Sequence, residues 1–148
     1  MAMKETEGSL RAYFLLAGAI SVLMSLRDLD AISGTPMSSL PTDWLLAIYV
    51  PLIVRLGLGA AYFIAGILLK TALPTGAGWI KHVLALGFVL MTSNAILIFA
   101  ILGTGVGRAG LIGAIIGVAI TVYLYKSVTR LSAEAVARVA APPPARVV

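Results

Sequence analysis

The 148-residue sequence contains no cysteine and only one histidine, His82. Without cysteine there can be no disulfide, no thiolate zinc site, no iron–sulfur cluster and no thiol nucleophile. One imidazole is too few for a haem or a metal centre built from histidines. We therefore expect the protein to hold no cofactor and no metal.

Charge is scarce as well. Only 11% of the residues are charged, 60% are hydrophobic, and the mean hydropathy is +1.04. A soluble domain of this length needs much more polar surface to face water. The composition therefore predicts an integral membrane protein with one membrane-embedded unit.

The apolar residues are gathered into four segments, each near the roughly 20 residues that a helix needs to cross a bilayer. The alternating pattern of a membrane β-barrel is absent. The sequence predicts an all-α, four-transmembrane-helix bundle with short loops, among them tight turns over Leu73–Gly78 and Gly103–Gly107. The expected spans are 10–29, 46–69, 80–102 and 109–126, within a transmembrane domain of residues 1–130 that a short helical or disordered tail, 131–148, follows.

Lysine and arginine are divided unequally between the two sides that this topology creates. One side would carry Arg27 and Arg108, and the other side would carry eight: Lys4, Arg11, Lys70, Lys81, Lys126, Arg130, Arg138 and Arg146. The positive-inside rule then predicts a multi-pass protein of the plasma (inner) membrane with both termini in the cytoplasm. The net charge of +5 follows from this topology and from attraction to anionic lipid, so no nucleic-acid partner is expected.

Arg55 is the lone charge inside the apolar stretch Trp44–Leu69. An arginine at the centre of a membrane helix costs about 2.5–3.5 kcal/mol on insertion scales, so a partner, a cavity or a ligand must hold it. Spacings of three and four residues place it on one helical face with glycines and a tyrosine, which favours a face turned towards other helices. The members of that face are Pro51, Arg55, Gly59, Tyr62 and Gly66.

The helical rise places Arg55 roughly 10 Å below the outer boundary of the bilayer, and Ser21 and Asn94 fall near the same level. No carboxylate lies at that depth in the sequence. A cation surrounded by hydrogen-bond donors is typical of a site for an anion or a polar headgroup. The candidate solute-binding residues are therefore Arg55, Asn94, Ser21 and Tyr62.

An alternative interpretation is purely structural. The long Arg55 side chain can extend towards the outer mouth and pair with Asp28, Asp30 or Asp43. Of these acids, Asp28 lies by spacing on the helical face of Ser21 and Ser25. Asn94 would then make a simple interhelical hydrogen bond. In that case the protein would be a noncatalytic membrane scaffold or an accessory subunit.

Small residues recur at intervals of four, a spacing that lets a second helix approach closely. The ridges of small residues are Ala109, Gly113, Gly117 and Thr121 on the fourth span, Gly57, Ala61 and Ala65 on the second, and Ala17, Ser21 and Ser25 on the first. Gly59 and Gly66 lie on the Arg55 face. We expect these residues to pack helices against one another within the chain, in a homo-oligomer or in a larger membrane complex.

An enzyme is not expected, because general acid–base catalysis needs a carboxylate, a histidine or a similar group positioned at the substrate. The spans contain none except at their ends. Two classes of function remain. One is a small oligomeric channel or carrier for an anion or polar solute near Arg55, and the other is the scaffold.

Overall fold

The computed structural model describes residues 6–34 and 41–141, apart from the side chains of Asp43, Trp44, Ala47, Asn94, Ile98, 101–111, Gly113 and Ala114. Over this part the chain is helical, with no strand. Its elements are α1 (Glu7–Ser33), α2 (Thr42–Ala72), the short 3-10 helix η2 (Leu73–Thr75) and α3 (Gly78–Ala140). The all-α prediction is confirmed.

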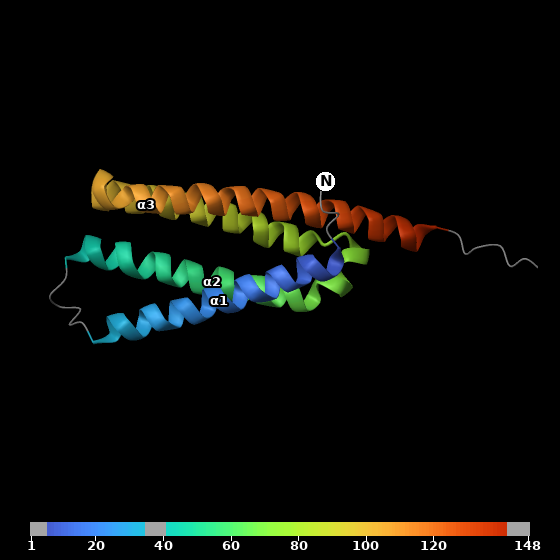
Figure 1. Ribbon diagram of the computed structural model, residues 1–148, viewed down its shortest axis with the longest axis horizontal. Helices are drawn as coiled ribbons and strands as arrows, with labels where there is room; N and C mark the ends of the chain where they lie inside the picture. Colours follow the sequence, from blue (N-terminus) through green and yellow to red (C-terminus); the bar gives the residue numbers. More distant parts are fainter. Residues whose placement is uncertain (1–5, 35–40, 142–148) are drawn as a thin grey trace, which may run out of the picture.

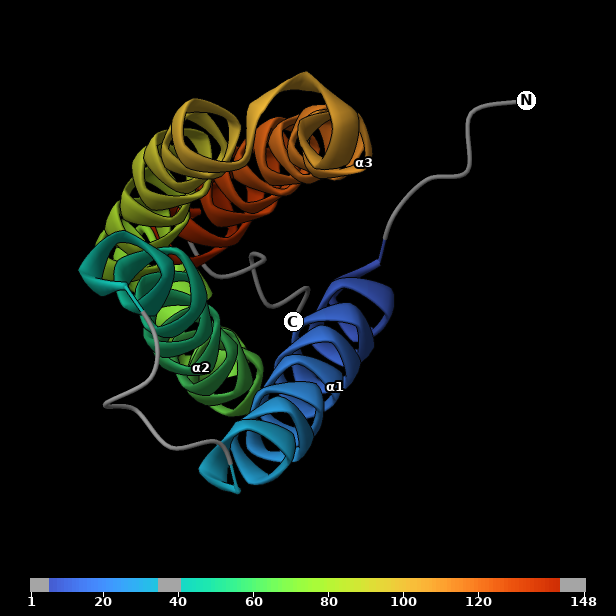
Figure 2. The ribbon, with the colours of Figure 1, turned by 90° about the vertical axis from the view of Figure 1, so that its left-hand side faces the viewer.

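The longest element, α3, folds back on itself. Its 63 residues would extend about 95 Å if the helix were straight. Instead, a first arm (residues 78–100) and a second arm (residues 112–140) lie side by side (Figures 1 and 2). A Cβ atom on Gly117 would lie 3.4 Å from the Met91 sulfur. The chain reverses direction between the two arms, where the sequence predicts a turn over Gly103–Gly107, although the backbone of that stretch is assigned as helix (Figure 1).

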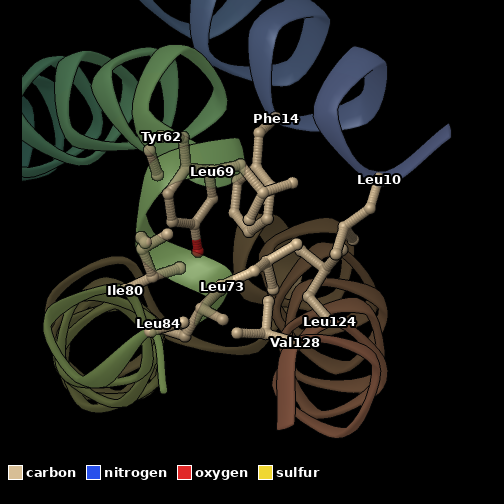
Figure 3. Close-up of a cluster of buried hydrophobic side chains, with 12 residues drawn as sticks. Leu10, Phe14, Tyr62, Leu69, Leu73, Ile80, Leu84, Leu124 and Val128 are labelled. Atoms are coloured by element: carbon tan, nitrogen blue, oxygen red, sulfur yellow. The ribbon is translucent and has the colours of Figure 1, made fainter. Parts of the chain in front are cut away.

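The antiparallel helices α1 and α2 form one pair, and the two arms of α3 form the other (Figure 1). The main buried apolar cluster joins both pairs near the end of the bundle where η2 connects α2 to α3, here called the η2 end (Figures 1 and 3). Its labelled members are Leu10, Phe14, Tyr62, Leu69, Leu73, Ile80, Leu84, Leu124 and Val128. The start of α1 and the end of α3 also lie at the η2 end (Figure 1).

Within the described residues, three helices are long and apolar enough to cross a membrane: Glu7–Ser33, Ile48–Thr75 and Gly78–Leu97. Large apolar side chains on the outer surface fit a lipid solvent, as at Ile53, which is 66% exposed, and Ile115, which is 67% exposed. The fourth predicted span, 109–126, overlaps positions whose side chains are not described. The count of four spans therefore stays a prediction.

The predicted tight turn over Leu73–Gly78 is present as η2 and the two residues that follow it. Gly76 has a φ of 87°, a left-handed conformation that glycine adopts without steric cost. The Gly76 N–H donates to the Leu73 carbonyl at 3.1 Å, and the Ala77 N–H donates to the Ala72 carbonyl at 2.8 Å. These bonds satisfy carbonyls that the end of a helix otherwise leaves unpaired.

The first part of the C-terminal tail, predicted to be helical or disordered, is helical. Because α3 continues to Ala140, residues 131–140 extend the last helix. Residues 142–148, the rest of the predicted tail, lie outside the described part.

Glycines allow α1 and α2 to approach closely. A Cβ atom on Gly18 would lie 2.5 Å from the Phe63 amide nitrogen, and one on Gly59 would lie 2.8 Å from the Ser21 Cβ. Gly66 packs in the same way against Leu15. The helix α1 packs extensively against α2 and only sparsely against α3.

Of the small residues predicted to pack, Gly57 makes no such contact within the chain, because a Cβ there would meet nothing within 4 Å, and its packing in an oligomer stays a prediction. Gly57 lies two residues before Gly59, about 200° away around the helix, so the two glycines cannot share a contact. Gly18 was missed. Its spacing to Ser21 and Ser25, three and then four residues, is the sequence signal that could have identified it.

Candidate functional site

A cavity of about 610 Å³ lies between α1, α2 and both arms of α3. Its polar lining comes from Tyr13, Ser21 and Asp28 of α1, Arg55 and Tyr62 of α2, and Thr121 of α3, and its other walls are mainly apolar. Tyr62 belongs to both the cavity lining and the buried cluster (Figure 3). Its ring packs edge-on against Phe14, with ring centroids 5.8 Å apart and an interplanar angle of 81°. Tyr62 therefore joins the cavity wall to the packed part of the bundle.

Arg55 and Asp28 form an ion pair at this cavity. Arg55 Nη1 donates to Asp28 Oδ2 at 3.1 Å, and the two side chains are 38% and 46% exposed. Side chains on a helix lean towards its N-terminus. Since α2 runs antiparallel to α1, Arg55 leans towards the end of the bundle where the C-terminal part of α1 presents Asp28 (Figure 1).

Ser21 fixes where the Arg55 main chain lies along α1. Its hydroxyl donates to the Arg55 main-chain carbonyl at 3.1 Å, across the contact between α1 and α2. The sequence placed Ser21 at the depth of Arg55 as a solute-binding residue. The structure places it on the cavity lining, with its hydroxyl proton already engaged in an interhelical hydrogen bond.

Two buried polar atoms at the cavity residues have no hydrogen-bond partner of good geometry in the described part of the chain: Arg55 Nη2 and Tyr62 Oη. The Thr121 hydroxyl lies near the Tyr62 hydroxyl and donates to the Gly117 carbonyl at 2.8 Å, but the two hydroxyl groups have no hydrogen bond of good geometry between them. An unsatisfied buried donor costs about 1–3 kcal/mol, so such groups point to a water molecule, an ion or a ligand. The cavity residues thus keep unused donor capacity.

Asn94 and Asp30 are two further residues that the sequence predicted at the site. The side chain of Asn94 lies outside the described part, so its predicted role is not tested. Asp30 is exposed, and Arg55 pairs with Asp28 instead. Asp30 lies about 200° further around α1 than Asp28, which explains why only one of the two acids reaches Arg55.

Two lining residues on α3, Met91 and Thr121, were not predicted as part of a site. Thr121 follows Gly117 by four residues, so the ridge of small residues on the fourth span was the available signal. Gly117 itself faces Met91 of the same chain, whereas the side-chain positions of Ala109 and Gly113 are not described. The part of the ridge that can be seen therefore packs the two arms of α3 together.

No protein-family model matches the chain, and no curated protein or solved structure matches it. The geometry of the Arg55 cavity is therefore the basis on which a function can be argued.

Replacing Tyr62 by phenylalanine is expected to leave the stability of the protein unchanged or to raise it by about 1 kcal/mol, because the change removes an unpaired buried hydroxyl. Gly87→Ala should lower stability, since its Cβ would lie 3.0 Å from Tyr62 Oη. Thermal unfolding in detergent would measure both. The double variant should recover most of the loss at Gly87. A clear loss of stability in Tyr62→Phe alone would contradict this account of the hydroxyl.

Proposed function

We propose that this protein binds a polar or anionic solute inside the membrane, at the cavity that Arg55 lines, and acts as a carrier or channel. The observation that carries the proposal is the position of the Arg55–Asp28 pair on the wall of a cavity of about 610 Å³ between the helices. A pair with only a packing role needs no such space. The solute is bound and passed on without any change in its covalent bonds.

The size and lining of the cavity support this function. Small-molecule sites have volumes of about 300–1,000 Å³ and combine apolar walls with a few polar groups that fix orientation. This cavity has that composition, with one ion pair and four hydroxyl side chains (Tyr13, Ser21, Tyr62 and Thr121) among apolar residues. Within apolar surroundings each polar contact is stronger than it is in water.

We also propose that the protein lies in the plasma (inner) membrane with both termini in the cytoplasm. Support comes from the excess of lysine and arginine on one side of the predicted topology. The start of α1 and the end of α3 lie at the same end of the bundle, as this topology requires (Figure 1). The Arg55 cavity would then open in the outer half of the bilayer.

Uptake into proteoliposomes tests the solute-binding function. Purified wild-type protein and Arg55→Leu would be compared with labelled phosphate, lactate, glycine and phenylalanine as probes. We expect uptake of at least one probe by the wild type and a loss of about tenfold or more in Arg55→Leu, since removing a charge that binds a ligand costs more than about 1.4 kcal/mol. Ile53→Leu, on the exposed surface of α2, is the matched control. Equal uptake by wild type and Arg55→Leu would contradict the proposal.

A second candidate function, a noncatalytic scaffold or accessory subunit, is favoured by one observation. The 3.1 Å contact with Asp28 neutralises Arg55 without any ligand. In that case none of the probes would be taken up, and the whole effect of Arg55→Leu would be a lower melting temperature. The same two preparations therefore separate the two functions.

A further inference from the structure

The charges that face the cavity restrict the chemistry of its solute. Arg55 and Asp28 both line it, and their side chains are in direct contact through Nη1 and Oδ2 at 3.1 Å. The pair is neutral as a whole but strongly dipolar. A solute that approaches Arg55 must therefore also approach a carboxylate.

Coulomb energies decide which solute gains from such a pair. Two unit charges 4 Å apart interact by about 4 kcal/mol at an effective dielectric constant of 20. A simple anion is attracted by Arg55 and repelled by Asp28 by similar amounts, so its net gain is small. A solute with one positive and one negative group, a few bonds apart, can lie antiparallel to the pair and gain from both contacts.

Both members of the pair have hydrogen-bonding capacity for this. A guanidinium offers five N–H donors, and a carboxylate offers about four acceptor positions. The structure gives their side chains one hydrogen bond in common, between Nη1 and Oδ2. The Arg55 Nη2 group has no partner in the described part of the chain. An anionic group of the solute would bind the guanidinium, and an ammonium group would bind the carboxylate.

The apolar part of the lining favours a solute that has an apolar group beside its charged groups. The walls beside Arg55 include Val54 and Leu58 of α2 and Ile120 and Met91 of α3. An apolar group that fills this space is removed from water at a gain of about 25 cal/mol per Å². A fully polar solute would leave these walls without contacts.

We infer that the cavity binds a zwitterion with an apolar body, in which an ammonium group faces Asp28 and a carboxylate or phosphate group faces Arg55. This inference rests on the proposed function and names its class of solute. Two sources have this chemistry: a free apolar amino acid, and a membrane lipid with a phosphoethanolamine headgroup.

The test uses the full chain in nanodiscs of phosphatidylglycerol, a lipid without an ammonium group. Binding of octyl phosphoethanolamine, octyl phosphate and octylamine, which share one tail, would be measured by calorimetry. The wild type should bind the zwitterion about tenfold more tightly than octyl phosphate or octylamine, each of which carries charge of one sign only, a difference of about 1.4 kcal/mol. Asp28→Asn, a change of nearly the same shape, should weaken the zwitterion about tenfold and strengthen octyl phosphate. Melting temperatures would verify that the variant is folded.

The results distinguish an error in the class of solute from a failure of the proposed function itself. If octyl phosphate bound as tightly as the zwitterion, and Asp28→Asn changed neither, the zwitterion class would be wrong while Arg55-dependent binding could stand. If Arg55→Leu left every affinity unchanged, or no probe bound the wild type, the proposed function would fail as well.

The source of the solute follows from competition with octyl phosphoethanolamine. Displacement by free phenylalanine would identify an amino acid. Loss of probe binding in nanodiscs that contain phosphatidylethanolamine would identify a lipid headgroup. If neither competed, the zwitterion class would be contradicted, because both competitors have the required groups.

Discussion

Replacing Gly18 by valine should destabilise the protein by about 3 kcal/mol or more, at the upper end of what overpacking costs. A Cβ atom at this position would lie 2.5 Å from the Phe63 amide nitrogen and 2.7 Å from the Gly59 carbonyl oxygen. Both of these are main-chain atoms, so no side-chain rotation can relieve the contact. The helices α1 and α2 would have to move apart along their whole contact, which also holds the Ser21–Arg55 hydrogen bond.

The matched control is Gly57→Ala. A Cβ atom there meets nothing within 4 Å, and alanine favours a helix over glycine by roughly 0.5–1 kcal/mol. We expect the alanine variant to be as stable as the wild type or slightly more stable. Thermal unfolding of the two variants in the same detergent, followed by circular dichroism, measures the difference. Equal melting temperatures would show that α1 and α2 do not pack as described.

The second large effect concerns the ion pair. Asp28→Leu leaves Arg55 without its partner in an apolar span. The change should destabilise the protein by about 2 kcal/mol, somewhat less than the roughly 2.5–3.5 kcal/mol that an arginine costs at the centre of a membrane helix. Arg55→Leu should cost less, because Asp28 lies near the end of α1 and can reach the polar headgroups. The double variant Asp28→Leu/Arg55→Leu should be close to the wild type, since replacing both members of the pair leaves no unpaired charge at the cavity.

These four proteins form a double-mutant cycle, which isolates the interaction between the two side chains. Asp30→Leu is the control, because Asp30 is exposed and lies two residues from Asp28. We expect little change from it. If Asp28→Leu and Asp30→Leu had equal effects, or if the double variant were as unstable as the sum of the single variants, the pairing of Arg55 with Asp28 would be contradicted.

The sequence predicted the position of several residues of the site, and their role in binding a solute stays a prediction. It placed Arg55 and Tyr62 on one face of α2 and Ser21 at the level of Arg55, because helical rise and spacing depend only on residue numbers. It left open whether Asp28 or Asp30 would reach Arg55. That choice depends on how α1 is rotated about its own axis, which the close approach at Gly18 and Gly59 fixes.

The small residues likewise show what a sequence pattern can predict and what depends on contacts between helices. Gly59 and Gly66 lie at the contact between α1 and α2, whereas Gly57 faces open space. All three fit a pattern of small residues, since glycine alone does not say which side of a helix another helix will cover. Thr121 was not predicted at the cavity because its neighbours there come from three other segments of the chain.

Composition and hydropathy are enough to predict lipid as the solvent, helices as the secondary structure, and one charge, Arg55, that needs a partner. These properties follow from the cost of unpaired polar groups in lipid. The contact of Arg55 with Asp28, and the position of the pair on the wall of a cavity, could be read from the folded chain alone. Hydropathy and helical spacing are local, whereas the rotation of one helix against another is set by contacts between distant residues.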